Sequence, residues 1–366
     1  MTNLTPLRSL LAKHHLDALL ITDVVNVSYL SGFTGDDTYL LITPNRAFLI
    51  TDFRYIEQAE QETKGFRIIR HKKGLIDKTV EIVKTQRIKR LGFESEALSF
   101  AVVKAFSKKL PPRCRFKPTS GLVASLRAIK SGEEIRRIRE AIICARNGFF
   151  DIRRLLKPGI RECDIAAELE YRMKKSGASR SAFGTIVAAD KRASLPHARA
   201  TDKPLTRPGL LQFDWGACLN SYNSDISRVV FLGKPTSFWQ KIYGIVQEAQ
   251  QRAINTVRAG VPTVEVDKAA RGFIASKGYG PNFGHGLGHG VGREVHELPR
   301  IRRATNSASP IPHSALLQTG MVFTIEPGIY LPGKGGIRIE DMVLVTPTGC
   351  EVLTSSIPKA IDRIII

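Results

Sequence analysis

The chain has 366 residues, 43% of them hydrophobic, so it can bury a large core, and its length suggests about two domains. These values exclude a disordered or fibrous protein. The net charge of +21 would suit a nucleic-acid-binding protein, but the basic residues are spread through both halves of the chain and accompany no nucleic-acid-binding motif, so we expect no nucleic-acid partner.

The first residues lack the pattern of a secretory signal, and no apolar run approaches the ~18 residues that a membrane span requires. The five cysteines are scattered and have no C-x-x-C spacing, which argues against a disulfide framework. We therefore expect a cytoplasmic protein that does not enter the membrane.

Helix and strand signals alternate over residues 1–128. The segments LTPLRSLLAKHH and YIEQAEQET have helical spacing of apolar residues, whereas LDALLIT, TYLLITP and RAFLITD are short apolar runs typical of strands. This alternation predicts a small α/β domain. It should end near residue 128, before a long amphipathic helix that Ser131 would cap and whose first turn contains Glu133 and Glu134.

Residues 129–366 combine helices with strands. After the long helix, three further helices are predicted over residues 161–177, 237–260 and 263–278, the first ending at Gly177 and the second at Gly260. Strand-like segments lie between these helices and fill the chain after residue 320. Helix pairs that alternate with antiparallel strands predict an α+β catalytic domain.

Four acidic residues stand in segments that otherwise read as buried strands: Asp214, Asp225, Glu326 and Glu340. A desolvated carboxylate is costly unless a cation or hydrogen-bond donors compensate, and clustered carboxylates raise one another's pKa. Turn residues in ACLNSYNS and PGIYLPGKGG predict two hairpins, each of which would bring together one pair of acids. Two divalent cations would balance the four charges, which Arg228 and Arg338 alone cannot do, so a dinuclear metal site is predicted.

The glycine-rich segment FGHGLGHGVGREVHE contributes three histidines, His285, His289 and His296, between the two acid hairpins. His289 completes a set of five ligands with the four acids. Carboxylate-rich coordination with one imidazole and no thiolate suits Mn(II), Co(II) or Fe(II), with Zn(II) as a further option, and of these we expect Mn(II). Two such ions would hold a bridging water and polarise a carbonyl oxygen, which predicts hydrolysis without a covalent intermediate.

These segments together resemble the pita-bread metallopeptidases, in particular the Xaa-Pro peptidases (aminopeptidase P and prolidase). The resemblance runs through FDWGACLNSYNSDISR, FGHGLGHGVGREVHELPRI, EPGIYLPGKGG and GIRIEDMVLVT, with LPHARATDKPL, VNVSYLSGFTG and LRAIKSGEEI further upstream. It covers nearly the whole chain. It implies a creatinase-like α/β domain over residues 1–128, a pita-bread catalytic domain over residues 129–366, and a homodimer.

The resemblance also implies a role for each site residue. The metal ligands would be Asp214, Asp225, His289, Glu326 and Glu340. Glu326 would also be the general base. Three histidines would position the substrate and stabilise the tetrahedral intermediate or the leaving group: His197, His285 and His296. Arg338 lies two residues before Glu340 on a predicted strand, so it is expected on the same face and paired with a ligand carboxylate.

The chain departs from the family pattern at Ser221, at Arg293 and in the segment AADKRAS. Four basic residues would make the approach to the site more positive: Lys191, Arg192, Arg199 and Arg293. They leave peptide length and side-chain preference open.

The resemblance implies a peptide substrate with proline at its second position. We expect an aminopeptidase that attacks the bond before that proline with a metal-bridging water. The alternative is a dipeptidase (prolidase), and a non-catalytic pita-bread binding module is more remote. The complete ligand set disfavours metal-free creatinase-like chemistry, and the full N-terminal domain disfavours methionine aminopeptidase.

Overall fold

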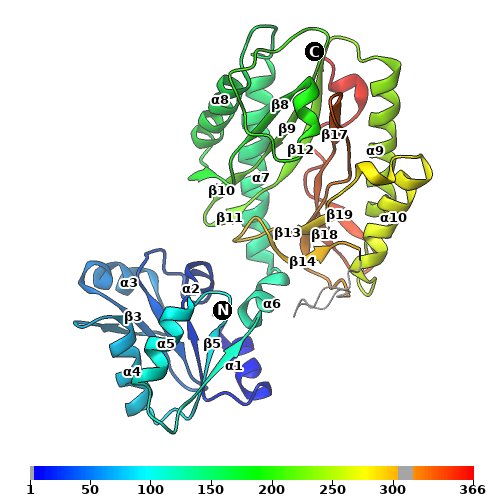
Figure 1. Ribbon diagram of the computed structural model, residues 1–366. Coiled ribbons are helices and arrows are strands. Elements are labelled where there is room, and N and C mark those ends of the chain that lie inside the picture. Colours follow the sequence, from blue (N-terminus) through cyan, green and yellow to red (C-terminus); the bar gives the residue numbers. More distant parts are fainter. Residues whose placement is uncertain (1–3, 304–315) are drawn as a thin grey trace. The chain divides into compact units, whose positions relative to one another are not determined.

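The computed structural model describes residues 4–303 and 316–366. The chain divides into two compact units, Met1–Arg127 and Ala128–Ile366 (Figure 1). In the described residues no helix is long and apolar enough to cross a membrane.

The first unit is a six-stranded mixed sheet with helices on both faces. In sheet order its strands are β4 (Arg67–Arg70), β3 (Ala47–Thr51), β2 (Tyr39–Ile42), β1 (Ala18–Ile21), β5 (Arg90–Glu94) and β6 (Arg115–Thr119). Its helices are α1 (Leu4–Lys13), α2 (Val24–Ser31), α3 (Ile56–Glu62), α4 (Leu75–Thr85), α5 (Phe100–Lys109) and α6 (Leu122–Ala128). This arrangement is the α/β architecture that the alternating signals predict.

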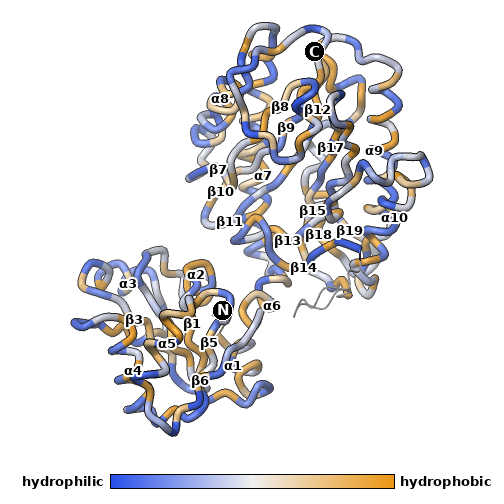
Figure 2. Tube along the Cα trace, viewed as in Figure 1, coloured by the Kyte–Doolittle hydropathy of each residue, from blue (hydrophilic) through white to orange (hydrophobic). Residues whose placement is uncertain are grey.

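Both faces of this sheet are buried, which explains its short, wholly apolar central strands. Along β1, Leu19 and Ile21 face a core that α1 and α2 complete, whereas Ala18 and Leu20 face a second core under α4 and α5. Apolar residues are accordingly concentrated on the strands of this unit (Figure 2). A strand covered on both sides needs apolar residues at every position instead of an alternating pattern.

The described residues of the second unit form four main helices, as predicted. They are α7 (Gly132–Arg153), α8 (Glu162–Lys175), α9 (Ser237–Thr256) and α10 (Thr263–Ser276). Helix α7 begins with a capping box in which the Ser131 hydroxyl accepts from the Glu134 amide and the Glu134 carboxylate accepts from the Ser131 amide. The predicted cap and acidic first turn are therefore present.

The strands of this unit lie between the two helix pairs α7–α8 and α9–α10 (Figure 1). Two three-stranded sheets come first: β8 (Ile186–Ala189), β9 (Gly209–Trp215) and β12 (Ile226–Leu232) form one, and β7 (Arg180–Ser181), β10 (Ala217–Leu219) and β11 (Tyr222–Asn223) form the other. The five-stranded sheet that follows contains β14 (Glu297–Ile301), β13 (Gly288–Gly290), β15 (Val322–Ile325), β18 (Asp341–Val345) and β19 (Cys350–Val352). The hairpin of β16 (Gly328–Leu331) and β17 (Gly335–Arg338) completes the layer.

Successive side chains of β9 point to opposite faces, and this alternation directs Asp214 toward the centre of the strand layer. Leu211, Phe213 and Trp215 pack against α7 and α8. Since successive residues of a strand point to opposite faces, Asp214 and Gln212 turn away from these helices and toward the other strands. The apolar half of the pattern therefore anchors the strand, and the polar half contributes to the site.

Candidate metal centre

The first acid pair comes from the β9–β12 hairpin. In its antiparallel register Asp214 lies opposite Ser227, and Trp215 lies opposite Ile226. Asp225 immediately precedes β12, so the hairpin places the two carboxylates on neighbouring strands. The predicted hairpin is present, with β10 and β11 inserted at its tip.

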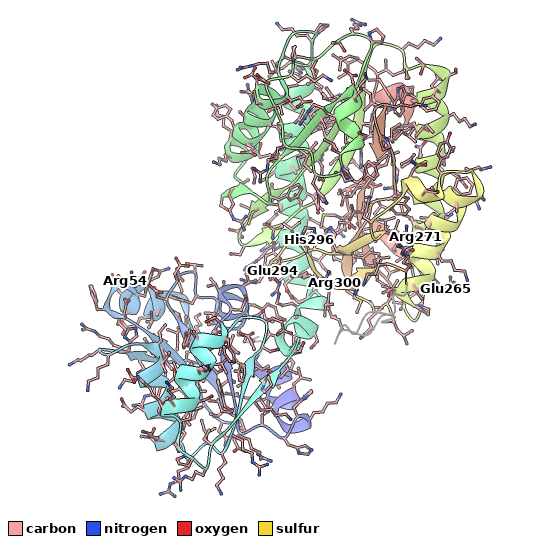
Figure 3. The ribbon with its side chains drawn as sticks, viewed as in Figure 1. Arg54, Glu265, Arg271, Glu294, His296 and Arg300 are labelled. Carbon is pink, nitrogen blue, oxygen red and sulfur yellow. The ribbon has the colours of Figure 1, made fainter. Side chains whose placement is uncertain are left out.

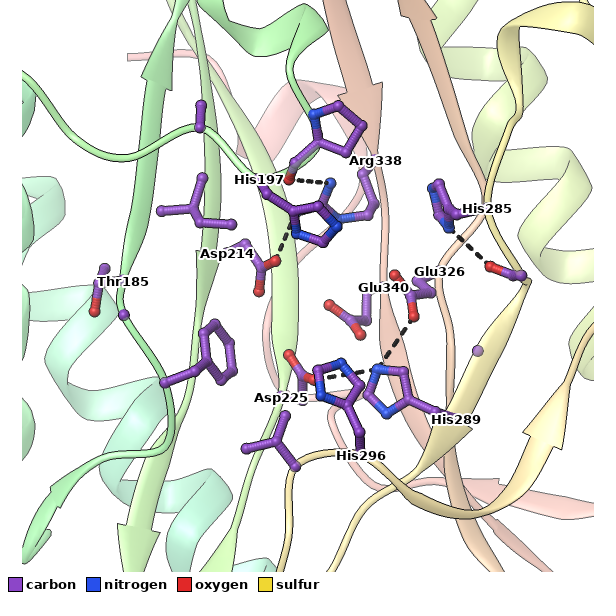
Figure 4. Close-up of a pocket in the computed structure, with 18 of the residues that line it drawn as sticks. Thr185, His197, Asp214, Asp225, His285, His289, His296, Glu326, Arg338 and Glu340 are labelled. Carbon is purple, nitrogen blue, oxygen red and sulfur yellow. Dashed lines mark hydrogen bonds and ion pairs between the residues drawn. The ribbon is translucent and has the colours of Figure 1, made fainter.

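The second pair comes from a longer hairpin that changes partners midway. Strand β15 pairs with β18, with Ile325 opposite Asp341, and the chain continues into the β16–β17 hairpin, where Gly328 lies opposite Arg338. Glu326 and Glu340 occupy the two breaks between these ladders. The sequence predicted them inside strands, but a break frees the local backbone from one continuous ladder and lets both side chains turn inward (Figure 4).

The five predicted ligands converge in one cluster (Figure 4). Donor atoms of Asp225, His289 and Glu340 all lie within 4.8 Å of one another. The Nε2 atom of His289 lies 3.3 Å from a carboxylate oxygen of Glu326 and 3.7 Å from one of Asp225. The fifth member, Asp214, lines the same cavity.

Burial and mutual repulsion perturb three of these carboxyl groups. Burial raises the pKa of Asp225 well above its usual range, and the charges of Glu340, Asp214 and Glu326 raise it further. The pKa of Glu340 is well above its usual value for the same reasons. Burial also raises the pKa of Asp214, although Arg338 opposes this effect. Ionising all of them together is therefore costly without added positive charge.

Glu326 behaves differently from its neighbours. Burial would raise its pKa, but the hydrogen bond from His289 and the positive charges of His289 and Arg338 outweigh burial and lower the pKa below its usual value. His289 responds in the opposite sense: burial lowers its pKa, and the interaction with Glu326 raises it above the usual value. Among the four acids, Glu326 is therefore the one whose ionised form the surrounding groups favour.

The donor set fits divalent cations. One oxygen of Asp214, Oδ1, is buried without a hydrogen-bond partner among the described residues, which is the state expected of an atom kept for a ligand. The other donors are carboxylate oxygens and one imidazole, the chemistry that Mn(II), Co(II) and Fe(II) accept.

Arg338 ties together the strands behind the cluster. Its Nη2 donates to Asp214 Oδ2 at 2.6 Å, and its Nε donates to the Ser227 hydroxyl at 2.8 Å. The same hydroxyl donates to Glu340 Oε2 at 2.8 Å. Arg228 is not part of this arrangement, because its guanidinium pairs with Asp341 at 2.7 Å. Arg338 therefore contacts the predicted ligand Asp214 directly, whereas the guanidinium of Arg228 pairs with Asp341 instead.

Tyr330 joins two of the predicted site residues and was not anticipated from the sequence. Its hydroxyl lies 3.0 Å from His285 Nε2 and accepts from Arg338 Nη1 at 2.8 Å. Burial lowers the pKa of His285, which favours its neutral form, and burial raises the pKa of Tyr330 to about 12. Tyr330 therefore remains a neutral phenol beside the cluster.

The segment that carries His285 and His289 is held from α10. Arg271 Nη2 donates to the carbonyl of His285 at 2.6 Å, and Asp267 Oδ1 accepts from the amide of Leu287 at 3.2 Å. Arg271 and Asp267 also pair with each other at 2.7 Å. Figure 3 shows Arg271 on this helix. The glycine-rich segment thus has a fixed support although it forms little regular structure.

The other two predicted histidines line the cavity. The ring centroid of His296 lies 4.1 Å from that of His289, and burial lowers the pKa of His296. His197 is exposed at the cavity and belongs to the segment that follows β8. The structure therefore gathers every predicted site residue around a single cavity of about 880 Å³.

We predicted that four basic residues would line the approach to the site, and for three of them this is wrong. Arg192 lies 3.0 Å from buried Glu162, and Arg293 lies over the ring of Tyr222 at 5.1 Å from its centroid. Of the four predicted basic residues only Arg199 lines the cavity. Helix α8 supplies the carboxylate that neutralises Arg192, and this contact could not be read from the sequence.

Two other arginines, Arg300 and Arg302, do line the cavity. Figure 3 labels Arg300 and His296. Within the described parts of the chain, neither these two arginines nor Arg199 forms an ion pair with a carboxylate. These residues lie in the ELPRIRR segment, which the sequence marked only as a local basic cluster. Their alternation along β14 and beyond, with Ile301 buried between them, was the available signal.

Each of the two units matches a known protein family. Residues 136–347 match the family described as metallopeptidase family M24, and residues 4–129 match the creatinase/prolidase N-terminal domain. These matches confirm the resemblance inferred from the motifs.

Three relatives are similar over almost their full length. An Xaa-Pro dipeptidase from Bacillus anthracis has a TM-score of 0.92 and 40% identity, covering 99% of each chain. An X-Pro aminopeptidase from Thermotoga maritima has a TM-score of 0.89 and 38% identity, covering 100% of each. The Xaa-Pro dipeptidase of Pyrococcus furiosus is 38% identical over 94% of this chain and 95% of its own. The expected pita-bread fold with a creatinase-like N-terminal domain is thereby confirmed.

Proposed function

Because this chain belongs to metallopeptidase family M24 and is thus a metal-dependent hydrolase, we propose that it is an Xaa-Pro dipeptidase. Similarity to the dipeptidases of Bacillus anthracis and Pyrococcus furiosus favours this function over the aminopeptidase expected from the sequence. Similarity to the X-Pro aminopeptidase of Thermotoga maritima keeps the aminopeptidase as the second candidate.

The observation that carries the dipeptidase assignment is the charge of the cavity lining. Arg199, Arg300 and Arg302 line the cavity that contains the carboxylate cluster, and none forms an ion pair with a described carboxylate. A dipeptide carries its free carboxylate one residue beyond the scissile bond, where a guanidinium group can bind it. A longer peptide has a neutral amide at that point.

The proposed ligands are Asp214, Asp225, His289, Glu326 and Glu340. Two divalent cations held there would polarise the scissile carbonyl and lower the pKa of a water molecule. We expect Mn(II) as the physiological ion.

Side chains of the protein would then accept the proton of the attacking water and pass it to the leaving group. Glu326 has a lowered pKa, so it is ionised and can accept a proton from the attacking water. The nitrogen of an Xaa-Pro bond is a tertiary amide without a hydrogen. It must be protonated to leave, and Glu326 can return the proton it accepted. His197, His285 and His296 surround this position and would donate hydrogen bonds to the substrate.

The test is a panel of four substrates with Mn(II)-loaded protein: Xaa-Pro, its C-terminal amide, Xaa-Pro-Yaa and a non-prolyl dipeptide. We expect Xaa-Pro to be cleaved fastest. The amide should lose about tenfold in kcat/KM, since a hydrogen bond to a charged group contributes ~1.5–3 kcal/mol. Chelator should abolish activity, and Asp225→Asn should lower it strongly.

Two results would contradict parts of this proposal separately. Faster cleavage of Xaa-Pro-Yaa than of Xaa-Pro would replace the dipeptidase with the aminopeptidase. Bound Mn(II) without cleavage of either prolyl substrate would overturn the proline assignment while leaving the metal site intact.

A further inference from the structure

A buried glutamine on α9 connects the two strand ends that carry the glutamates of the site. Gln250 is completely buried, and its Nε2 donates to the carbonyl of Ile325 at 3.1 Å and to that of Ile339 at 3.2 Å. These carbonyls belong to the peptide bonds that immediately precede Glu326 and Glu340. One amide group therefore holds the backbone at both positions.

Strand pairing is interrupted at this point, because Ile325 pairs with Asp341 on one side of the two glutamates and Gly328 pairs with Arg338 on the other. Strand β15, which ends at Ile325, pairs with β13 and β18, whereas β17, which ends just before Ile339, pairs with β16. In the described sheets β15 and β17 are not neighbours, and between the two flanking pairs the Ile339 amide donates to the carbonyl of Pro327 at 3.4 Å. The Gln250 amide bridges them at the point where the two glutamates leave the backbone.

The orientation of this amide is set by a lysine. Lys359 Nζ donates to Gln250 Oε1 at 2.9 Å, and an ammonium group can only donate. Gln250 must therefore present its oxygen to Lys359 and its nitrogen to the two carbonyls. The lysine is itself held on α9, because its backbone carbonyl accepts from Tyr243 at 2.7 Å and from Gln247 at 3.0 Å.

Through Asp341 and Arg228, the same lysine also supports the backbone of Glu340. Lys359 Nζ also donates to Asp341 Oδ2 at 2.7 Å, and Asp341 Oδ1 accepts from Arg228 Nη2 at 2.7 Å. Arg228 in turn donates to the backbone carbonyl of Glu340. The peptide groups on both sides of Glu340 are thus held by one buried network, in which Asp341 and Arg228 are fully buried.

We propose that Gln250, oriented by Lys359, is a positioning residue that sets the separation of Glu326 and Glu340 and thereby the affinity of the site for divalent cations. This role rests on the proposed function, in which both glutamates are ligands. Groups that orient metal ligands typically change metal affinity or activity by about 10–100-fold when they are replaced.

The test replaces Gln250 with a residue of the same size. Gln250→Glu keeps an acceptor for Lys359 but removes both donors and directs a carboxylate oxygen at the two carbonyls. Gln251→Glu is the matched control, because Gln251 is the next residue on α9, is exposed, and its side chain donates to Asn255 on the same helix. Mn(II) binding to each metal-free protein is measured by calorimetry, and folding is checked by circular dichroism.

We expect Gln250→Glu to bind Mn(II) at least about tenfold more weakly than the wild type, with Gln251→Glu unchanged. Activity of Gln250→Glu should recover when Mn(II) is raised, and KM for the peptide should stay near the wild-type value. Wild-type Mn(II) affinity in a folded Gln250→Glu protein would overturn the positioning role.

A second variant covers the case in which Gln250→Glu does not fold. Lys359→Met removes the group that orients the amide, at a side chain that is 25% exposed. It should also weaken Mn(II) binding, and unchanged affinity would overturn the proposal. If the wild type itself binds no Mn(II), the ligand set of the proposed function fails, which is a different result from a wild type that binds and variants that bind equally well.

Discussion

Tyr330 illustrates what a single residue contributes to this site. Its hydroxyl connects His285 with Arg338, and Arg338 contacts the carboxylate of Asp214. Sequence reasoning reached His285, Arg338 and Asp214 because histidines and charged residues in apolar segments are conspicuous. A tyrosine in a strand reads as an ordinary packing residue, and its partners lie 45 and 8 residues away in the chain.

Tyr330→Phe keeps the ring and removes only the hydroxyl. We expect kcat to fall by about thirtyfold with a small change in KM, because a net hydrogen bond contributes ~1 kcal/mol and two are lost. The matched control is Tyr279→Phe, whose hydroxyl makes no side-chain hydrogen bond in the described residues. Steady-state kinetics with Mn(II) measures both. Equal effects of the two substitutions would contradict a role for the Tyr330 hydroxyl.

At the scale of elements, one carboxylate supports the loop that carries His197. Glu162 at the start of α8 is fully buried and accepts from the amides of Ala189 and Thr201, at 2.7 and 3.0 Å. It also pairs with Arg192, inside the loop. Both ends of the segment that contains His197 are therefore attached to the same helix.

Glu162→Ala leaves these donors without an acceptor. We expect the second unit to lose about 3 kcal/mol of stability, as when one partner of a buried ion pair is removed, and KM to rise as His197 becomes mobile. Glu168→Ala is the control on the same helix, since its ion pair with Arg172 is about one-third exposed and should contribute little to stability. Urea unfolding followed by tryptophan fluorescence is selective here, because both tryptophans, Trp215 and Trp239, lie in the second unit. Equal stability of the two variants would contradict the support role.

Elements themselves were the more predictable part of the fold. The four main helices of the second unit follow the predicted segments, because amphipathic periodicity and caps are local properties. The breaks at Glu326 and Glu340 were not predicted. A strand is identified by its own residues, whereas the point at which it changes partners depends on which distant strand lies beside it.

At the scale of the whole molecule, every proposed site residue and every group that supports it lies within Ala128–Ile366. We therefore expect residues 129–366 to form an autonomous catalytic domain. A fragment of these residues should fold and bind Mn(II) with the affinity of the full chain, as measured by calorimetry. A folded fragment that binds no Mn(II) would show that the first unit contributes to the metal site. The homodimer also stays a prediction, which sedimentation can test.

The net charge of +21 shows the limit of a whole-chain property. It could not identify which basic residues face the substrate. Ion pairing with Glu162 removes Arg192 from the approach, and burial of Ile301 turns Arg300 and Arg302 toward the cavity. That the chain has no nucleic-acid partner stays a prediction from its sequence.

Local features of the chain were enough to predict the α+β class, the main helices and the acids and histidines of the proposed site. These follow from local periodicity, and from the cost of burying charge, which makes an acid in an apolar segment conspicuous wherever it occurs. How the acids are held became visible in the folded chain alone: by the Ser227 hydroxyl, by the Arg338 guanidinium, which the Tyr330 hydroxyl contacts, and, behind them, by the Gln250 amide. Neutral polar side chains of this kind are common throughout proteins, and they become distinctive only when folding buries them against a specific partner.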